Sequence, residues 1–253
     1  MLIAGVDLAW SGRKPTGICL LDAASGSVEL LELRCTEATH TALEIAAWLD
    51  SLGPDVVAGI DAPLIVTDQR RAEAELARRF GRQGVFAYAA RNGFLDRHGI
   101  LEGPRLGDRL AGGGWNLDPA HVTAGTSGRH ALELFPHAII VSLFGAPSAL
   151  KYKKGARQAR LGPLADFQSL LRTHCSELLP GALSRGIFSE VVSVVPGRQL
   201  KAIEDQLDAL ACALGAYHIW KSGPSGTLVF GDAGNGYIAV PRPVTSSLEP
   251  SYP

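Results

Sequence analysis

The stretch "LIAGVDLAWSG" at residues 2–12 decides how the fold begins. A short apolar run ends in one carboxylate, Asp7, and then gives way to Ser-Gly and Pro, which is typical of a buried strand that ends at the aspartate. The stretch "DVVAGIDAPL" at residues 55–64 repeats this design, with Asp61 at the end of the apolar run and proline after it. Two strand-end aspartates of the same kind indicate a functional site.

The residues between the two aspartates predict how their strands are arranged. Strand patterns occur at residues 2–6, 16–22, 27–35 and 55–60, and a helical pattern covers residues 39–51. Thr41 followed by Glu44 is a capping-box signature at the start of that helix. The order β-β-β-α-β predicts a mixed α/β sheet in which a helical crossover brings the fourth strand beside the first. We therefore expect Asp7 and Asp61 to lie at the same edge of the sheet.

The rest of the chain adds helices to this sheet. We interpret residues 62–128, with an exposed charged helix at 67–80, as an insertion that folds over the sheet edge. Later patterns predict a strand that enters a helix at Pro136, an amphipathic helix at 162–179 and a long helix at 199–221. Without an internal repeat or a clear linker, residues 1–240 are predicted to form one domain. Residues 241–253, rich in Pro and Ser, are predicted to be disordered.

Composition excludes several classes of protein. The 253 residues are 46% hydrophobic, and 24 Lys and Arg balance 25 Asp and Glu, so no global charge marks a nucleic-acid or membrane binder. An anionic partner would have to be held locally. Four scattered cysteines, three of them in apolar runs, argue against zinc and for a reduced, cytoplasmic protein. No apolar run approaches about 18 residues and no export segment precedes the first strand, so we expect neither membrane insertion nor export.

Each acidic candidate near the strands also has a purely structural interpretation. Asp7 and Asp61 could form turns or cap the segment that follows. Glu133 interrupts the apolar run "HALELF" before a strand-to-helix turn, where a solvent-facing strand position would explain it equally well. Two carboxylates buried at adjacent strand ends are costly, however, unless a cation neutralises them. We therefore favour a shared metal site at this edge.

The long helix carries two further acids three residues apart, Asp205 and Asp208. At about 100° per residue, Asp208 lies almost in line with Gly215 and close to Ala211 and Cys212, and such small residues would let the helix approach the sheet. Asp205 is offset by about 60° and lies one turn nearer the helix start. We expect Asp208 to point at the sheet. A solvated acidic first turn is the structural alternative.

Taken together, these residues resemble a known family. The strand-end aspartates, the β-β-β-α-β order and the late "DQLDALACAL" are similar to the ribonuclease H-like superfamily, and the D-x-x-D-A-L-A run resembles that of Holliday-junction resolvases. The ordered set "GVDLAWSG", "GIDAPL", "ELFPHA", "KYKKG" and "DALACALGAY" resembles, over nearly the whole chain, an uncharacterised domain-of-unknown-function family of predicted RNase H-like nucleases. The resemblance implies an α/β fold with a mixed five-stranded sheet flanked by helices, and a divalent-metal phosphodiesterase site.

The resemblance also implies roles for the acids. Asp7, Asp61, Glu133 and Asp208 match the catalytic and metal-binding positions, and Asp205 matches an extra upstream aspartate. Because the ligands carry only hard oxygens, Mg²⁺ or Mn²⁺ is favoured. Two ions about 3.5–4 Å apart would activate a water and stabilise the leaving oxygen, with Asp7 bridging both ions. Asp205 is either a further metal ligand or a carboxylate that contacts the ligands rather than the metal.

The basic segment "LKYKKGARQAR" at residues 150–160 is the candidate for holding nucleic acid. Its five cations, with no acid among them, are Lys151, Lys153, Lys154, Arg157 and Arg160. Positively charged side chains of this kind form ion pairs with the phosphates of nucleic acid, and Tyr152 could stack on a base. A solvated basic loop is the structural alternative. The sequence leaves open the type of nucleic acid and whether two copies form a homodimer.

We expect a metal-dependent nuclease, and two other functions stay open. An actin-like phosphotransferase also opens with a β-meander and an aspartate, and "GDAGNG" at residues 231–236 is rich in glycine, but such kinases need two lobes. A non-catalytic RNase H-fold protein could bind a partner through the Arg-rich insertion, although it would not need four converging acids. The chain contains no Ser-His-Asp order, no H-E-x-x-H and no phosphate-binding G-x-x-x-x-G-K.

Overall fold

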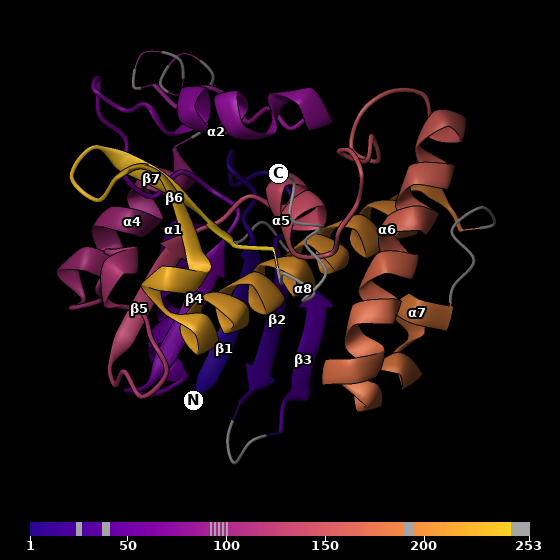
Figure 1. Cartoon of the computed structure of the whole chain (residues 1–253), viewed down its shortest axis with the longest axis horizontal. Coiled ribbons are helices and arrows are strands. Elements are labelled where there is room, and N and C mark those ends of the chain that lie inside the picture. The colour runs from indigo at the N-terminus through magenta and orange to yellow at the C-terminus, as the bar shows by residue number, and fades with distance from the viewer. Residues whose placement is uncertain are drawn as a thin grey trace, which may run out of the picture.

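A five-stranded mixed sheet forms the centre of the computed structural model, which describes residues 1–23, 27–36, 41–91, 93, 95, 97, 99, 101–189 and 195–243 (Figure 1). The strands are β1 (Leu2–Asp7), β2 (Gly17–Asp22), β3 (Glu29–Cys35), β4 (Val56–Ile60) and β5 (Arg129–Glu133), in the order β3-β2-β1-β4-β5. The first three strands form an antiparallel meander, whereas β4 is parallel to β1 and β5 is parallel to β4. The predicted mixed α/β sheet is confirmed, and it is consistent with an RNase H-like fold.

Helix α1 (Ala42–Ser51) makes the crossover that brings β4 beside β1. It begins at the predicted capping box, because the backbone N–H of Thr41 donates to Oε2 of Glu44 over 2.8 Å. Residues 39 and 40, where the predicted helix started, lie outside the described residues. The parallel pairing that this crossover creates is what places the carboxyl ends of β1 and β4 at one edge.

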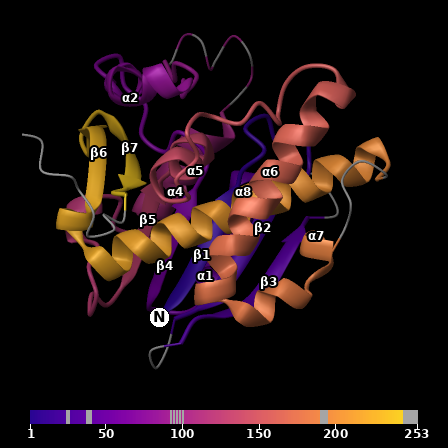
Figure 2. The same ribbon diagram turned by 45° about the vertical axis from the view of Figure 1, so that its right-hand side comes forward.

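Helices cover both faces of the sheet, because alternate strand residues point to opposite sides. On one face, Ile3 packs into a core with α5 (Pro136–Ser142), α6 (Arg157–Leu178), α7 (Gly186–Ser189) and the long α8 (Gly197–Ser222). On the other face, Ala4 packs with α1 and α4 (Glu102–Gly112). Figure 2 shows α8 running diagonally across the strands.

The close approach of α8 depends on glycines in the sheet. A Cβ at Gly5 would lie 2.0 Å from the carbonyl oxygen of Ala209, and one at Gly59 would lie 2.5 Å from that of Cys212. Cys212 therefore faces the sheet, as the helical periodicity predicted. Gly215, which we also expected there, packs instead on α5 and on the end of β5. The backbone contact holds the carboxylates of α8 at the strand ends.

The charged helix of the predicted insertion and the C-terminal region pack together beside the carboxyl edge of the sheet, whereas α4 of the same insertion covers a face of the sheet. The charged helix of the insertion, α2 (Ala72–Phe80), is shorter than the predicted 67–80 and packs on a hairpin of β6 (Thr227–Asp232) and β7 (Gly236–Pro241). The sequence analysis did not predict this hairpin, whose turn explains the glycines of "GDAGNG". In that turn, Oδ1 of Asp232 accepts the backbone N–H groups of Gly234 and Asn235.

The C-terminal segment and the hydropathy of the helices are the last features of the fold. The segment predicted to be disordered starts at residue 241, but Pro241 is the last residue of β7, and residues 244–253 lie outside the described residues. Across the described chain, no helix combines the length and the apolar character that a membrane span requires.

Candidate functional site

Asp7 and Asp61 lie side by side, as predicted from the two strand patterns. The parallel register pairs Val6 with Ile60, and the backbone N–H of Asp61 donates to the carbonyl oxygen of Val6 over 2.8 Å. Glu133 ends the next strand, opposite Ile60. Three neighbouring parallel strands thus each deliver one acid to the same edge.

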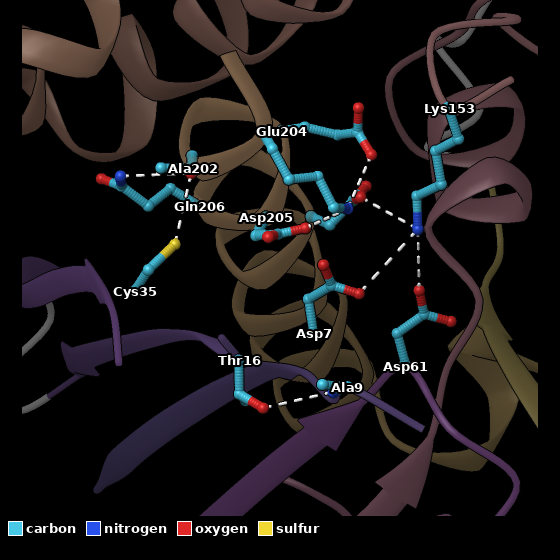
Figure 3. Close-up of polar contacts among 12 residues, drawn as sticks. Asp7, Ala9, Thr16, Cys35, Asp61, Lys153, Ala202, Glu204, Asp205 and Gln206 are labelled. Atoms are coloured by element: carbon cyan, nitrogen blue, oxygen red, sulfur yellow. Dashed lines mark hydrogen bonds and ion pairs between the residues drawn. The ribbon is translucent and has the colours of Figure 1, made fainter. Parts of the chain in front are cut away.

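A lysine ammonium lies between the aspartates of this edge and one aspartate of α8. Nζ of Lys153 is 3.0 Å from Oδ2 of Asp208, 3.2 Å from Oδ2 of Asp61 and 3.9 Å from Oδ1 of Asp7. Figure 3 shows Lys153 entering from the segment between α5 and α6, opposite the strand ends. The Asp208 side chain is fully buried, whereas that of Lys153 remains 27% exposed. One cation therefore holds carboxylates from three different elements.

The cluster has three carboxyl groups for one ammonium group. Burial raises the pKa of Asp7 well above its usual value, and Lys153 only partly opposes this because Asp208 and Asp61 add repulsion. Burial likewise raises the pKa of Asp208 to about 6, against the opposing effect of Lys153. Burial acts to lower the pKa of Lys153, but the three carboxyl groups together outweigh it and raise that pKa well above the ordinary range. Three carboxyl groups sharing one ammonium are under-neutralised.

Asp208 is oriented by a buried tyrosine. The Tyr152 hydroxyl donates to Oδ1 of Asp208 over 2.6 Å, and the tyrosine ring packs between His137 and Phe167. Because the Tyr152 side chain is fully buried, it cannot stack on a base, so that part of our interpretation of the basic segment was wrong. Tyr152 instead fixes the direction in which Asp208 presents its second oxygen.

Asp205 lies one turn along α8 from Asp208 and belongs to a different ion pair. Nζ of Lys201 is 2.5 Å from Oδ1 of Asp205 and 2.8 Å from Oε1 of Glu204. Among the contacts between described residues, Lys153 reaches Asp208 and not Asp205. The structure therefore places Asp208 in contact with Lys153, whereas Asp205, which is also buried, pairs with Lys201 and lines the cavity described below.

Glu133 ends its strand at the site but is held by another cation. The guanidinium of Arg70 forms a buried, two-pronged ion pair with both carboxylate oxygens of Glu133, and the Leu64 backbone N–H donates to Oε2 over 3.0 Å. Burial raises the pKa of Glu133 to about 7, and Arg70 opposes this rise. Arg70 lies in the segment 67–80 that was predicted to be an exposed charged helix, but its side chain is buried and also binds Glu73.

The predicted basic segment divides into structural and exposed cations. Arg160 pairs with Glu204 of α8, and Arg157 donates to the carbonyl oxygen of Val195 over 2.7 Å, so both tie α6 to the rest of the protein. Lys153 belongs to the aspartate cluster. Lys151 and Lys154 are exposed and line a cavity in front of that cluster.

This cavity has a volume of about 660 Å³, and its wall includes Asp7, Asp61 and Lys153. Asp208 does not line it, because its side chain is fully buried. The sequence analysis missed the aromatic part of the wall, to which Trp10 and residues 86–88 contribute. A signal was present in "GVFAYAA", residues 84–90, where two aromatic side chains occur in a short segment without helical periodicity.

The side chains fit a hard divalent cation in type and charge but not in their present spacing. Their oxygens surround the lysine nitrogen at 3.0–3.9 Å, whereas Mg²⁺ is bound at about 2.0–2.1 Å. Accordingly, no three His, Cys, Asp or Glu side chains within the described ranges are close enough to hold one ion together. Oδ2 of Asp208 is buried, and the Lys153 ammonium lies 3.0 Å from it, so a metal at this oxygen would have to replace the ammonium.

Comparison with known proteins identifies the family. Residues 5–230 match the family described as "Protein of unknown function (DUF429)". The chain belongs to this family. The match begins within β1, at residue 5, and includes the other four strands of the sheet and α8, so it contains all the acids of the DUF429 site. No curated protein and no solved structure matches the chain.

Proposed function

We propose that this DUF429 protein hydrolyses phosphodiester bonds in nucleic acid with the help of Mg²⁺ or Mn²⁺ held by Asp7, Asp61 and Asp208. One observation carries the proposal: aspartates from two strand ends and one helix converge on a single cation that does not neutralise them. A divalent ion in place of the ammonium would supply the missing positive charge. Burying three carboxylates has no evident value for stability alone, since apolar side chains of similar volume would serve as well or better.

The residues around the three aspartates would prepare them for the ion. The Tyr152 hydroxyl fixes one oxygen of Asp208, which leaves the other to face the ion. Lys201 holds Asp205 at the border of the cluster, where the carboxylate adds negative potential without being a direct ligand. When bound, the ion would polarise the phosphate and lower the pKa of a bound water.

Lys153 would have to leave the centre of the cluster when the ion arrives. Its side chain is flexible and already lines the cavity, so a short movement would carry the ammonium from the carboxylates to the position of a substrate phosphate. In this interpretation Lys153 pairs with the aspartates, and offsets part of their repulsion, before metal binding and pairs with the phosphate afterwards. The same lysine would then serve both the stability of the metal-free protein and its function.

The test compares two neighbouring aspartates of α8 as a matched pair. Manganese binding is measured by isothermal titration calorimetry, and cleavage is measured on labelled DNA, RNA and junction substrates with Mg²⁺, Mn²⁺ or EDTA. We expect Asp208→Asn to abolish cleavage and to weaken Mn²⁺ binding at least tenfold, which is about 1.4 kcal/mol. We expect Asp205→Asn to retain cleavage at a higher metal concentration. Absence of Mn²⁺ binding and of cleavage by the wild-type protein would refute the proposal.

A further inference from the structure

The wall of the cavity beside the aspartates is unusually rich in accessible aromatic surface. Phe86 is 65% exposed and Tyr88 is 54% exposed, although large apolar side chains are normally covered. Trp10 also lines the cavity, and its indole N–H donates to the carbonyl oxygen of Asp61 over 2.9 Å. This bond fixes the indole next to a candidate metal ligand. Flat rings are therefore presented within the same cavity as the carboxylates.

Exposed lysines share this cavity with the aromatic side chains. Lys14, Lys151 and Lys154 line it, and in the part of the chain that the structure describes none of them pairs with a carboxylate. Nζ of Lys154 lies 4.0 Å from the centre of the Tyr88 ring, in a cation–π contact. A ligand that carries a flat ring and a phosphate could offer each of these two side chains a new partner. Its ring would stack on Tyr88, and its phosphate would form an ion pair with the ammonium of Lys154.

We propose that the cavity binds unpaired nucleotides of a single-stranded nucleic acid and guides the adjoining phosphodiester to the aspartates, an inference that rests on the proposed function. Stacking on Phe86 and Tyr88 requires a base with a free face, and a duplex keeps its bases stacked inside. A volume of about 660 Å³ also lies within the range of small-ligand sites, about 300–1,000 Å³. The substrate class is thus single-stranded DNA or RNA, or an unpaired end or loop.

Binding of a short fluorescein-labelled single strand, and of a blunt hairpin duplex of the same length, is measured by anisotropy in EDTA and in CaCl₂. The variants are Phe86→Ala and Tyr88→Ala. The matched control is Leu43→Ala, which removes a side chain that is 60% exposed outside the cavity. We expect the single strand to bind at least tenfold more tightly than the duplex. Each aromatic variant should lose about 5- to 150-fold in affinity for the single strand, and the control should lose none.

Equal affinity for the single strand and the duplex, or full affinity in both aromatic variants, would overturn the inference. Competition identifies the source of the binding: a mononucleotide should displace the strand weakly and inorganic phosphate should not displace it. Displacement by phosphate as readily as by a mononucleotide would show that no base is bound, and would also overturn it.

A failure here is distinguishable from a failure of the proposed function. Phe86→Ala and Tyr88→Ala are expected to bind Mn²⁺ like the wild-type protein, because among the described residues the ring of Tyr88 contacts Lys154 and neither aromatic side chain forms a hydrogen bond or ring contact with the aspartates or Lys153. If the wild-type protein cleaves duplex DNA with Mn²⁺ and shows no preference for single strands, the inference fails and the metal-dependent activity stands. If it binds single strands through both aromatic residues but binds no metal, the proposed function fails instead.

Discussion

Replacement of Lys153 by methionine should destabilise the protein without metal and strengthen its binding of metal. Methionine keeps most of the length of the side chain and removes only the charge and the hydrogen-bond donors. In the wild-type protein one ammonium group attracts three buried or partly buried carboxyl groups and offsets part of their mutual repulsion. In Lys153→Met these groups would repel one another, and only protons or an added cation could relieve the repulsion.

The distances give the magnitude. At 3.0, 3.2 and 3.9 Å, and with an effective dielectric constant of about 20, each pair contributes about 4–6 kcal/mol of gross attraction. Desolvation of the ammonium and repulsion between the carboxylates offset most of this attraction. Measured losses on removing one partner from a buried ion pair are about 3–5 kcal/mol, and we expect a loss of this size in the free energy of unfolding in EDTA.

Urea unfolding in EDTA and in millimolar MnCl₂ measures this loss and its recovery. Manganese should restore about 2.7 kcal/mol when its concentration reaches about 100 times its dissociation constant. Calorimetry should show at least tenfold tighter Mn²⁺ binding by Lys153→Met than by the wild-type protein, because no ammonium has to be displaced. If the variant folds only when Mn²⁺ is present, that result also supports the reasoning.

The control for this experiment is Lys154→Met, because Lys154 lies next in sequence but contacts the Tyr88 ring rather than a carboxylate. It should change the free energy of unfolding by less than about 0.5 kcal/mol and leave Mn²⁺ affinity unchanged. The reasoning is refuted if Lys153→Met unfolds at the wild-type urea concentration in EDTA, or if it binds Mn²⁺ more weakly than the wild-type protein.

Three further predictions concern the packing around the site. Gly5→Ala should lower the free energy of unfolding, measured by urea titration, by about 3 kcal/mol or more, because its Cβ would lie 2.0 Å from a carbonyl oxygen of α8. Gly162→Ala is the control: no atom lies within contact distance of its Cβ on α6, so it should raise the same free energy by about 0.5–1 kcal/mol. Arg70→Leu should lower that free energy by about 3–5 kcal/mol by leaving Glu133 buried without its cation, and a double variant in which both become leucine should recover most of the loss. Burial lowers the pKa of His218 to about 4, so this histidine binds fewer protons in the folded protein than in the unfolded chain between about pH 6.5 and pH 4. Its own contribution to the free energy of unfolding should therefore fall by up to about 3 kcal/mol as the pH falls through this window, and a His218→Gln variant whose urea midpoint fell as steeply as that of the wild-type protein would contradict this.

The elements that carry strong local signals could be predicted from the sequence. The runs that end in Asp7 and Asp61 are short, apolar and followed by residues that break a strand, as buried strands are, and the capping box of Thr41 marks the start of the crossover helix. The direction of Asp208 followed from the 3.6-residue helical repeat. Each of these features is encoded within a few neighbouring residues, which is why it could be found without the structure.

The partners of charged side chains could not be predicted, because they are set by contacts between distant segments. Lys153 reaches Asp7 across 146 positions of the sequence, and Arg70 reaches Glu133 across 63. From the sequence, Lys153 was one of five similar cations. The hairpin of β6 and β7 was missed for a different reason: the glycines of its turn were weighed as a sign of a phosphotransferase, although both strands, at six residues, are as long as β1.

The most direct test of the metal site is anomalous diffraction from crystals soaked in MnCl₂. The account predicts at least one manganese peak within ligand distance of Asp7, Asp61 and Asp208, with the ammonium of Lys153 moved out of the cluster toward the cavity. A structure without a manganese peak at this edge, in which Lys153 still lies between the three aspartates, would contradict the central claim.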